Sequence, residues 1–88
     1  MNTIFLSRFY KDLDRIGDKY IKERLLKIIE EVESANRIYE IKNIKKLVGD
    51  KISYRIRLAD YRIGLYYENN TIEFARIVHR KDIYKVFP

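Results

Sequence analysis

The chain has 88 residues, of which 47% are hydrophobic and 36% charged, with 19 Lys/Arg, 13 Asp/Glu, one histidine and no cysteine. This length fits one domain spanning residues 1–88, and this composition excludes a disordered chain, a disulfide framework and a Cys/His zinc site. Neither a signal-peptide pattern nor a run of about 18 apolar residues occurs, so we expect a soluble cytoplasmic protein.

The net charge of +6 belongs to the second part of the chain. Residues 1–36 hold seven basic and seven acidic side chains, whereas residues 37–88 hold twelve and six. A basic field of this kind attracts phosphate. Charge alone leaves nucleic acid, an acidic protein partner and an anionic lipid open as ligands, with solubility as the simplest alternative.

The first part predicts a strand and two helices. Residues 2–7 form a short β-rich run. Ser7 is a candidate N-cap for a first helix that ends at Gly17, and Asp18 caps a second, longer helix. Apolar residues recur at helical spacing in both: Phe9, Leu13 and Ile16, then Ile21, Leu25, Ile28, Ile29 and Val32. We expect a helical hairpin that covers one face of a sheet, with Glu23 and Lys27 paired on its outer side.

Residues 36–50 are polar and lysine-rich, and they fit a turn, a short strand or both. From Ile52 the apolar period becomes two, which predicts three antiparallel strands if residues 59–60 and 69–70 are two-residue hairpin loops. The loops fix which residues share the face that packs on the helices: Ile52, Tyr54, Ile56, Leu58, Tyr61, Ile63, Leu65, Tyr67, Ile72, Phe74 and Val78. The fold class is therefore α+β, with an N-terminal strand, a two-helix hairpin and an antiparallel β-meander.

The opposite face gathers cations: it holds Ser53, Arg55, Arg57, Arg62, Gly64, Tyr66, Glu73, Ala75, Ile77 and His79. Arg57 lies opposite Arg62, an arrangement that disfavours folding unless an anion neutralises it. Gly64 beside Ala75 predicts a depression next to the arginines. In this register Arg76 falls on the core face, so it must reach an edge or pair with a helix carboxylate such as Asp12.

These residues restrict the possible chemistry. Carboxylates in the basic part of the chain are widely spaced, so neither a metal site nor any other cofactor is expected. Metal-free attack of a ribose 2′-OH on the adjacent phosphate fits, because arginine grips two phosphate oxygens and keeps its charge. Proton transfer would fall to His79, to a tyrosine, or to a group whose pKa is shifted by its neighbours. His79 has the equal alternative of a surface imidazole paired with Asp60, and Tyr84 that of a residue anchoring the tail in the core.

Four fragments, in order, resemble the RelE/ParE superfamily of type II toxin–antitoxin systems, and specifically its RelE branch. They lie within "KKLVGDKISYRIRLADYRIGLYY" and "FARIVHRKDIY". The matching elements are Leu47 with Gly49, the strand Tyr54–Arg57, the turn and strand start Asp60–Arg62, and the terminal His79–Tyr84. The order of a strand, two helices and a meander agrees over nearly the whole chain.

The resemblance implies a toxin that cleaves mRNA in the ribosomal decoding site and is held inactive by a small, partly acidic antitoxin in a hetero-oligomer. Arg62 resembles the arginine that stabilises the transition-state phosphate, Arg80 its partner near the leaving group, and Tyr84 the tyrosine that orients or deprotonates the 2′-OH. Arg55 and Arg57 match positions filled by lysine in well-studied members, a departure that favours His79 as a proton-transfer group.

Other positions complete the prediction. Lys45, Lys46 and Lys51 are expected to bind RNA, and Tyr66 to stack a base or to cover the sheet. Ala59 replaces a glycine common in the family, which predicts strain in the turn. Two other functions stay open: a ParE-like inhibitor of DNA gyrase, and a non-catalytic module that binds RNA or an antitoxin.

Overall fold

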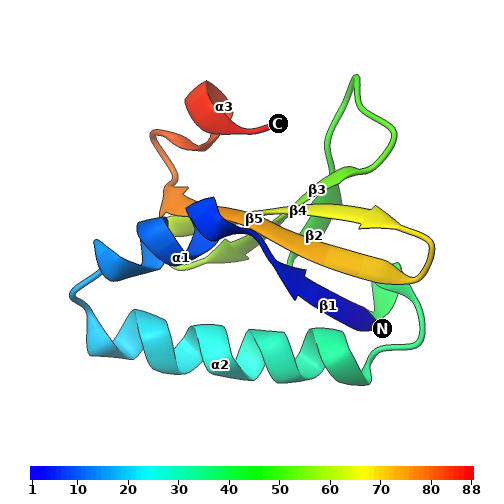
Figure 1. Cartoon of the computed structure of the whole chain (residues 1–88), viewed down its shortest axis with the longest axis horizontal. Coiled ribbons are helices and arrows are strands. Elements are labelled where there is room, and N and C mark those ends of the chain that lie inside the picture. The colour runs from blue at the N-terminus through cyan, green and yellow to red at the C-terminus, as the bar shows by residue number, and fades with distance from the viewer.

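The structure is a computed structural model that describes residues 1–88, with two helices on one face of a five-stranded sheet and a short third helix on the other (Figure 1). None of the helices has the length and apolar character needed to cross a membrane. In chain order the elements are β1 (Asn2–Phe5), α1 (Ser7–Asp14), α2 (Lys19–Ser34), a 3-10 turn η1 (Ile38–Glu40), β2 (Ile44–Lys46), β3 (Ser53–Leu58), β4 (Tyr61–Glu68), β5 (Thr71–His79) and α3 (Ile83–Val86).

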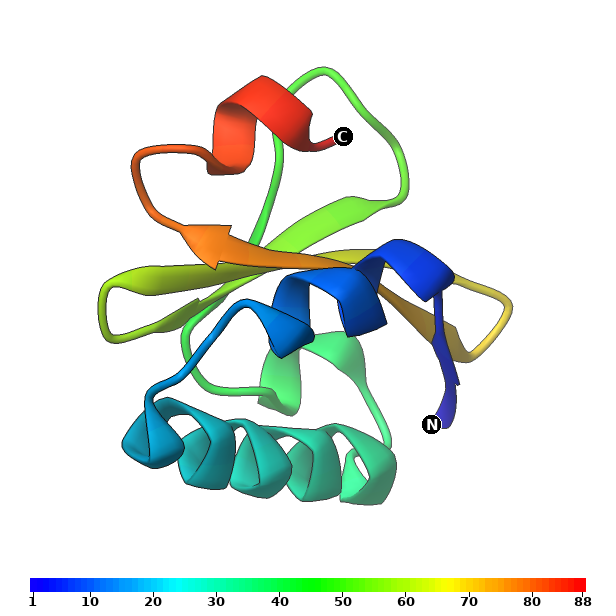
Figure 2. The ribbon, with the colours of Figure 1, turned by 60° about the vertical axis from the view of Figure 1, so that its left-hand side comes forward.

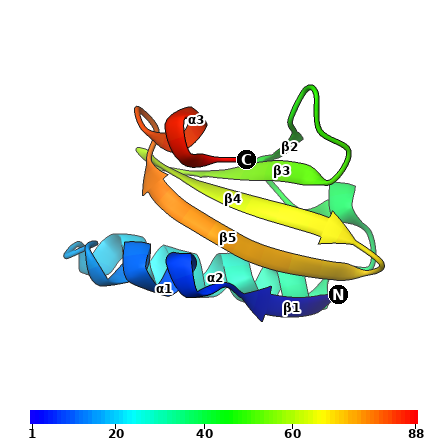
Figure 3. The same cartoon turned by 45° about the horizontal axis from the view of Figure 1, so that its top comes forward.

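The sheet has the order β1-β5-β4-β3-β2 (Figure 3). Strands β2 to β5 form an antiparallel meander, and β1 pairs with β5 in parallel. The predicted α+β fold, with its N-terminal strand, helical hairpin and meander, is confirmed. Residues 36–50, which fitted a turn or a strand, contain both: the turn η1 and the edge strand β2.

The two long helices begin for different reasons. Asp18 caps α2 as predicted, because its carboxylate accepts the Tyr20 N–H at 2.9 Å. The predicted Ser7 cap is wrong: Leu6 is the N-cap of α1 and no side chain caps it. The apolar residues of the two helices pack against the sheet in one core cluster. Its most buried members from this part of the chain are Phe9, Ile16, Ile21, Leu25 and Val32. The predicted Glu23–Lys27 pair does not form, and Lys27 instead lines a cleft beside α2.

Both predicted hairpin loops occur. Leu58 pairs with Tyr61 and Glu68 with Thr71, so each loop has two residues. Asn69 and Asn70 lie in the left-handed region with φ of 53° and 57°, which asparagine tolerates. Ala59 has a φ of 52°, where a Cβ costs about 1–2 kcal/mol. The strain predicted for Ala in place of Gly is thus present in the backbone.

A β-bulge at Ala75 changes the predicted register of β5. Leu65 pairs with Phe74, but Gly64 pairs with Arg76, so Ala75 is an extra residue. Ile77 therefore belongs to the core, at 1% exposure, and Val78 to the opposite face. His79 pairs with Tyr61, not with Asp60. The predicted faces of these three residues were wrong because strand alternation carries no sign of a bulge.

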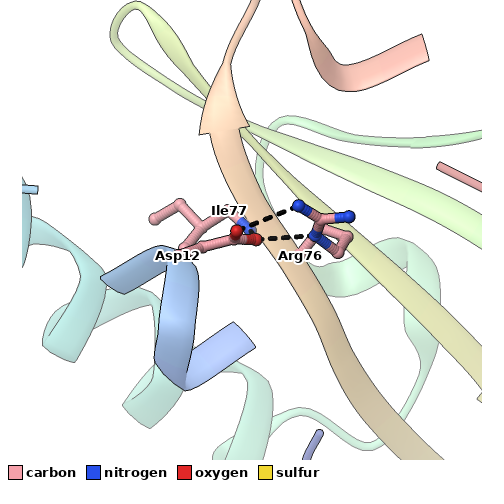
Figure 4. Close-up of polar contacts among 3 residues, drawn as sticks. All are labelled: Asp12, Arg76 and Ile77. Carbon is pink, nitrogen blue, oxygen red and sulfur yellow. Dashed lines mark hydrogen bonds and ion pairs between the residues drawn. The ribbon is translucent and has the colours of Figure 1, made fainter. Parts of the chain in front are cut away.

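Arg76 lies at the bulge and pairs with Asp12, one of the two arrangements expected for it (Figure 4). The buried Asp12 carboxylate accepts hydrogen bonds from Arg76 Nε at 2.7 Å and from its terminal nitrogen at 3.0 Å. It also accepts the Ile77 N–H at 3.0 Å, at the edge of β5 beyond the pairing with β1. The hydrogen bond with Asp12 raises the pKa of Arg76. Through these contacts, Asp12 fixes α1 to β5.

Candidate active site

Four arginines and a tyrosine gather on the sheet face opposite α1 and α2. Figure 2 shows α3 lying over that face. Arg55 and Arg57 come from β3, Arg62 from β4, Arg80 from the turn after β5, and Tyr84 from α3. We call these five residues the arginine cluster. Arg57 and Arg62 are cross-strand partners, as predicted from the hairpin loop.

Arg62 is the central member of the arginine cluster. One of its terminal nitrogens donates to the carbonyls of Ala59 and Tyr61, each at 2.8 Å, which holds the guanidinium near the strained turn. Burial is the first cause that lowers the pKa of Arg62, followed by the positive charges of Arg55, Arg57 and Arg80. The electrostatic interaction with Tyr84 instead raises the pKa of Arg62. The other four side chains of the cluster therefore each lie within electrostatic range of Arg62.

The positive charge of the cluster is left largely uncompensated. The structure contains three ion pairs, and a single one involves the cluster: Arg80 Nε lies 3.9 Å from Asp60 Oδ1, with both side chains exposed. Exposed pairs of this length contribute little. A phosphate, which carries a full negative charge and several acceptor oxygens, would complement three or four guanidinium groups.

Tyr84 extends over the cluster from α3. Its hydroxyl accepts a hydrogen bond from Arg55 Nε at 3.3 Å, and its side chain is 65% exposed. The alternative that Tyr84 anchors the tail in the core is therefore wrong. Its neighbours do so, because Ile83 and Phe87 are buried against Leu47 and Ala75.

Phe87 fills the depression that small strand residues predict. A Cβ added to Gly64 would lie 2.7 Å from the Phe87 ring, so only glycine permits this contact. The prediction of an open dip beside the arginines was wrong, because α3 folds back over the sheet and covers it. Phe87 supports the site, and sequence reasoning missed it. A glycine within a strand was the available signal, since it often marks a close approach of another group.

The remaining predicted residues divide between the two faces. Lys45 is paired with Arg55, so it extends the cationic row, and Tyr66 lies on the same face with its ring 5.0 Å from that of Phe87. Lys46 points to the other face: it lies over Tyr54, and its amine donates to the carbonyls of residues 50 and 51. Lys51 is exposed in that loop.

His79 is not part of the arginine cluster. Its ring lies 6.0 Å from the Tyr61 ring, beside α1, and its Nδ1 accepts the Lys81 N–H at 3.2 Å. The expectation that alternation aims His79 at the arginines fails because of the bulge. Strand β5 continues through His79, and in the turn that follows the Arg80 N–H donates to the Asp60 carbonyl at 2.7 Å.

Comparison with known proteins gives the family. Residues 4–84 match the family described as ParE toxin of type II toxin–antitoxin system, parDE. The chain is 42% identical to Toxin RelE3 of Methanocaldococcus jannaschii over 89 residues, which cover the whole of both chains. No group of three His, Cys, Asp or Glu side chains in the structure could hold a metal ion.

Solved structures agree. The chain matches one in the RelB-RelE antitoxin-toxin complex from Methanococcus jannaschii with a TM-score of 0.82 and 40% identity, covering 97% of this chain and 99% of that one. A chain of the RelE-RelB complex from Pyrococcus horikoshii OT3 has a TM-score of 0.72 at 22% identity, with 93% and 97% covered, and shows the same fold. The chain therefore belongs to the ParE toxin family of type II toxin–antitoxin systems, which confirms the predicted superfamily.

Proposed function

We propose that this toxin is a metal-independent endoribonuclease that cleaves mRNA in the decoding site of the ribosome. The observation that supports this function is the arginine cluster, in which Arg62 has three further permanent cations and one tyrosine within electrostatic range. RNA supplies both the phosphate that such a place attracts and the 2′-OH that attacks it.

The reaction is an in-line transfer at phosphorus. The 2′-oxygen forms a bond to the adjacent phosphorus, the bond to the 5′-oxygen of the next nucleotide breaks, and a 2′,3′-cyclic phosphate and a 5′-hydroxyl result. Arg62 stabilises the charge that grows on the phosphoryl oxygens, and Arg80 lies near the leaving oxygen. Tyr84 orients the 2′-OH and relays its proton to solvent, and the leaving 5′-oxygen takes a proton from solvent. Arg55 fixes the tyrosine through the 3.3 Å hydrogen bond.

A cognate antitoxin is the proposed protein partner. The solved relatives are toxins in complex with RelB. A chain with a net charge of +6 favours an acidic, amphipathic segment, laid across the arginine cluster or against the helical hairpin. Such a complex would cover the cations and keep RNA out.

The test is primer extension on mRNA from cells induced for the wild type, Arg62→Ala, Arg80→Ala and Arg37→Ala. Loss of one charge-stabilising donor should lower cleavage by about 10²-fold or more in the first two variants. Arg37 is an exposed arginine near η1, and its replacement should leave cleavage unchanged. Undiminished cleavage in the Arg62→Ala, Arg80→Ala double variant would refute the assignment.

Inhibition of DNA gyrase is the second candidate, because the matching family carries the ParE description. The same induced cells distinguish the two activities. Cuts inside codons that disappear in the Arg62→Ala variant support the ribonuclease, whereas DNA breaks without mRNA cuts support gyrase poisoning. Neither kind of break would indicate a module that only binds.

A further inference from the structure

A second cationic site lies beside the arginine cluster, in a cleft of about 270 Å³ between α2 and the start of β2. Its lining consists of Arg24, Lys27, Ile28, Glu31, Lys42, Asn43 and Arg57. We propose that this α2 cleft binds the phosphate backbone of the RNA strand being cut, a few nucleotides from the scissile phosphate. The inference rests on the proposed ribonuclease function and extends it.

The charge of the α2 cleft is the first reason. Four cations and one carboxylate line it, which leaves a net charge of +3, and none of the three ion pairs in the structure involves them. Glu31 accepts a backbone N–H, that of Lys42, at 3.4 Å, and Arg24 donates to the Tyr20 hydroxyl at 3.2 Å. One carboxylate does not balance four cations, and the excess of like charge destabilises the free chain, so an external anion is the missing partner.

The position of Arg57 is the second reason. Arg57 is the cross-strand partner of Arg62 and also lines the α2 cleft, so one residue belongs to both sites. The backbone N–H of Arg57 donates to the Asn43 carbonyl at 3.2 Å, so the end of β3 lies beside the start of the edge strand β2. The cations therefore form a row from Arg80 through Arg62 and Arg57 to Lys42 and α2. A single RNA strand carries one phosphate per nucleotide, so a strand held at Arg62 extends naturally along this row.

The polar lining decides between RNA and a peptide. Ile28 is the one apolar residue among the seven that form the α2 cleft. A docked peptide helix draws its affinity from apolar and aromatic anchors in well-packed pockets, and this cleft offers no such pocket. Single-stranded nucleic acid is instead held by positively charged grooves that follow its backbone.

The experiment measures binding of a fluorescein-labelled 2′-O-methyl RNA of about 12 nucleotides, which keeps its phosphates but lacks the attacking hydroxyl. Fluorescence anisotropy compares the wild type with the Lys27→Gln, Lys42→Gln double variant. The control is Lys19→Gln with Lys22→Gln, which removes the same charge from exposed positions at the start of α2. The cleft variant should raise Kd about tenfold near 50 mM salt and the control less than twofold. The slope of log K against log salt should fall by about 1.4, or 0.7 for each lost contact.

Cleavage assays on ribosome-bound mRNA separate this inference from the proposed function. The cleft variant should keep the wild-type kcat at saturating RNA and raise KM, whereas Arg62→Ala loses kcat. Three results would each refute RNA binding by the cleft, even where cleavage is confirmed. They are equal RNA affinity in the cleft and control variants, no RNA binding by the wild type, and a loss of affinity confined to antitoxin binding. If the wild type cuts no RNA but the cleft variant still loses RNA affinity, the proposed ribonuclease activity is refuted and RNA binding by the cleft is supported.

Discussion

Arginine in place of a titratable group defines the chemistry of the site at the residue scale. A guanidinium keeps its charge at every accessible pH, so in the proposed reaction Arg55, Arg57, Arg62 and Arg80 would bind phosphate but exchange no protons. Tyr84 is the member of the cluster able to transfer one. His79, the other candidate from sequence, lies beside Tyr61 on the far side of the sheet. We therefore expect Tyr84→Phe, not a His79 variant, to affect proton transfer.

One carboxylate outside the site gives a prediction about pH. Asp50 Oδ1 accepts the N–H groups of Ile52 at 2.9 Å and Ser53 at 3.1 Å, which shapes the loop beside α3. The Ile52 hydrogen bond is the largest cause that lowers the pKa of Asp50 below its ordinary 3.8. A carboxyl whose pKa is depressed by folding stabilises the folded state above its unfolded pKa and loses that effect as pH falls through the folded pKa.

The expected result is a melting temperature of the wild type above that of Asp50→Asn at neutral pH, with a gap that narrows as pH falls below 3.8. Thermal unfolding, followed by circular dichroism from pH 7 down to the lowest pH at which the chain still folds, measures this difference in melting temperature. Asp14→Asn, an exposed carboxylate on α1, is the control and should show no such narrowing. A gap that widens in acid would contradict the sign.

At the scale of elements, α3 is held on the sheet by the contact of Phe87 with Gly64. We expect Gly64→Ala to displace this helix, because the new Cβ would lie 2.7 Å from the ring, and overpacking costs about 1–3 kcal/mol. Amide exchange of residues 83–88 should become faster. RNA cleavage should fall at least about tenfold, since Tyr84 loses its position.

Gly17→Ala is the matched control for that change, because nothing lies within 4 Å of a Cβ added there. It should leave both amide exchange and cleavage at wild-type values. An unaltered tail in the Gly64→Ala variant would mean that Phe87 does not anchor α3.

The contact of α1 with β5 depends on Asp12. Asp12→Ala should lower the free energy of unfolding by about 3–5 kcal/mol, because it leaves the Arg76 guanidinium and the Ile77 N–H without their acceptor. Urea denaturation measures the loss. Asp14→Ala, two residues away and exposed, should stay within about 0.5 kcal/mol of the wild type.

Much of the fold could be predicted because local signals agreed. The Asp18 cap, the helical stripe from Ile21 to Val32 and the Asn69-Asn70 turn each carry a mechanism that acts within a few residues. The hairpin loop at residues 59–60 then placed Arg57 against Arg62 correctly. Three of the five residues of the arginine cluster, Arg55, Arg57 and Arg62, followed from that register.

The rest depended on contacts distant in sequence. The bulge at Ala75 leaves the alternation of apolar residues readable in either register, so the faces of Ile77 and His79 could not be deduced. The docking of Phe87 on Gly64 joins residues 23 apart, and neither has a partner in its own neighbourhood that would signal it. The arrival of Tyr84 over Arg55 depends on that docking.

The charge of the whole molecule determines how it meets its partner. Twelve basic against six acidic residues after position 36 create a field that speeds encounter with an acidic chain. We expect the association rate with the antitoxin to fall at least about tenfold between roughly 50 and 500 mM salt, with a smaller change in dissociation. Stopped-flow mixing of the separated proteins measures both rates. An association rate that does not change with salt concentration would indicate an apolar interface on the helical hairpin.

The cross-strand pair Arg57 and Arg62 has a thermodynamic consequence for the free toxin. An anion bound at the site would relieve the repulsion between the two charges, so either RNA or an inhibitor would shift the folding equilibrium toward the native chain by mass action. The free toxin would then be less stable than either complex. Protection from unfolding and the silencing of activity would then be two effects of one binding event.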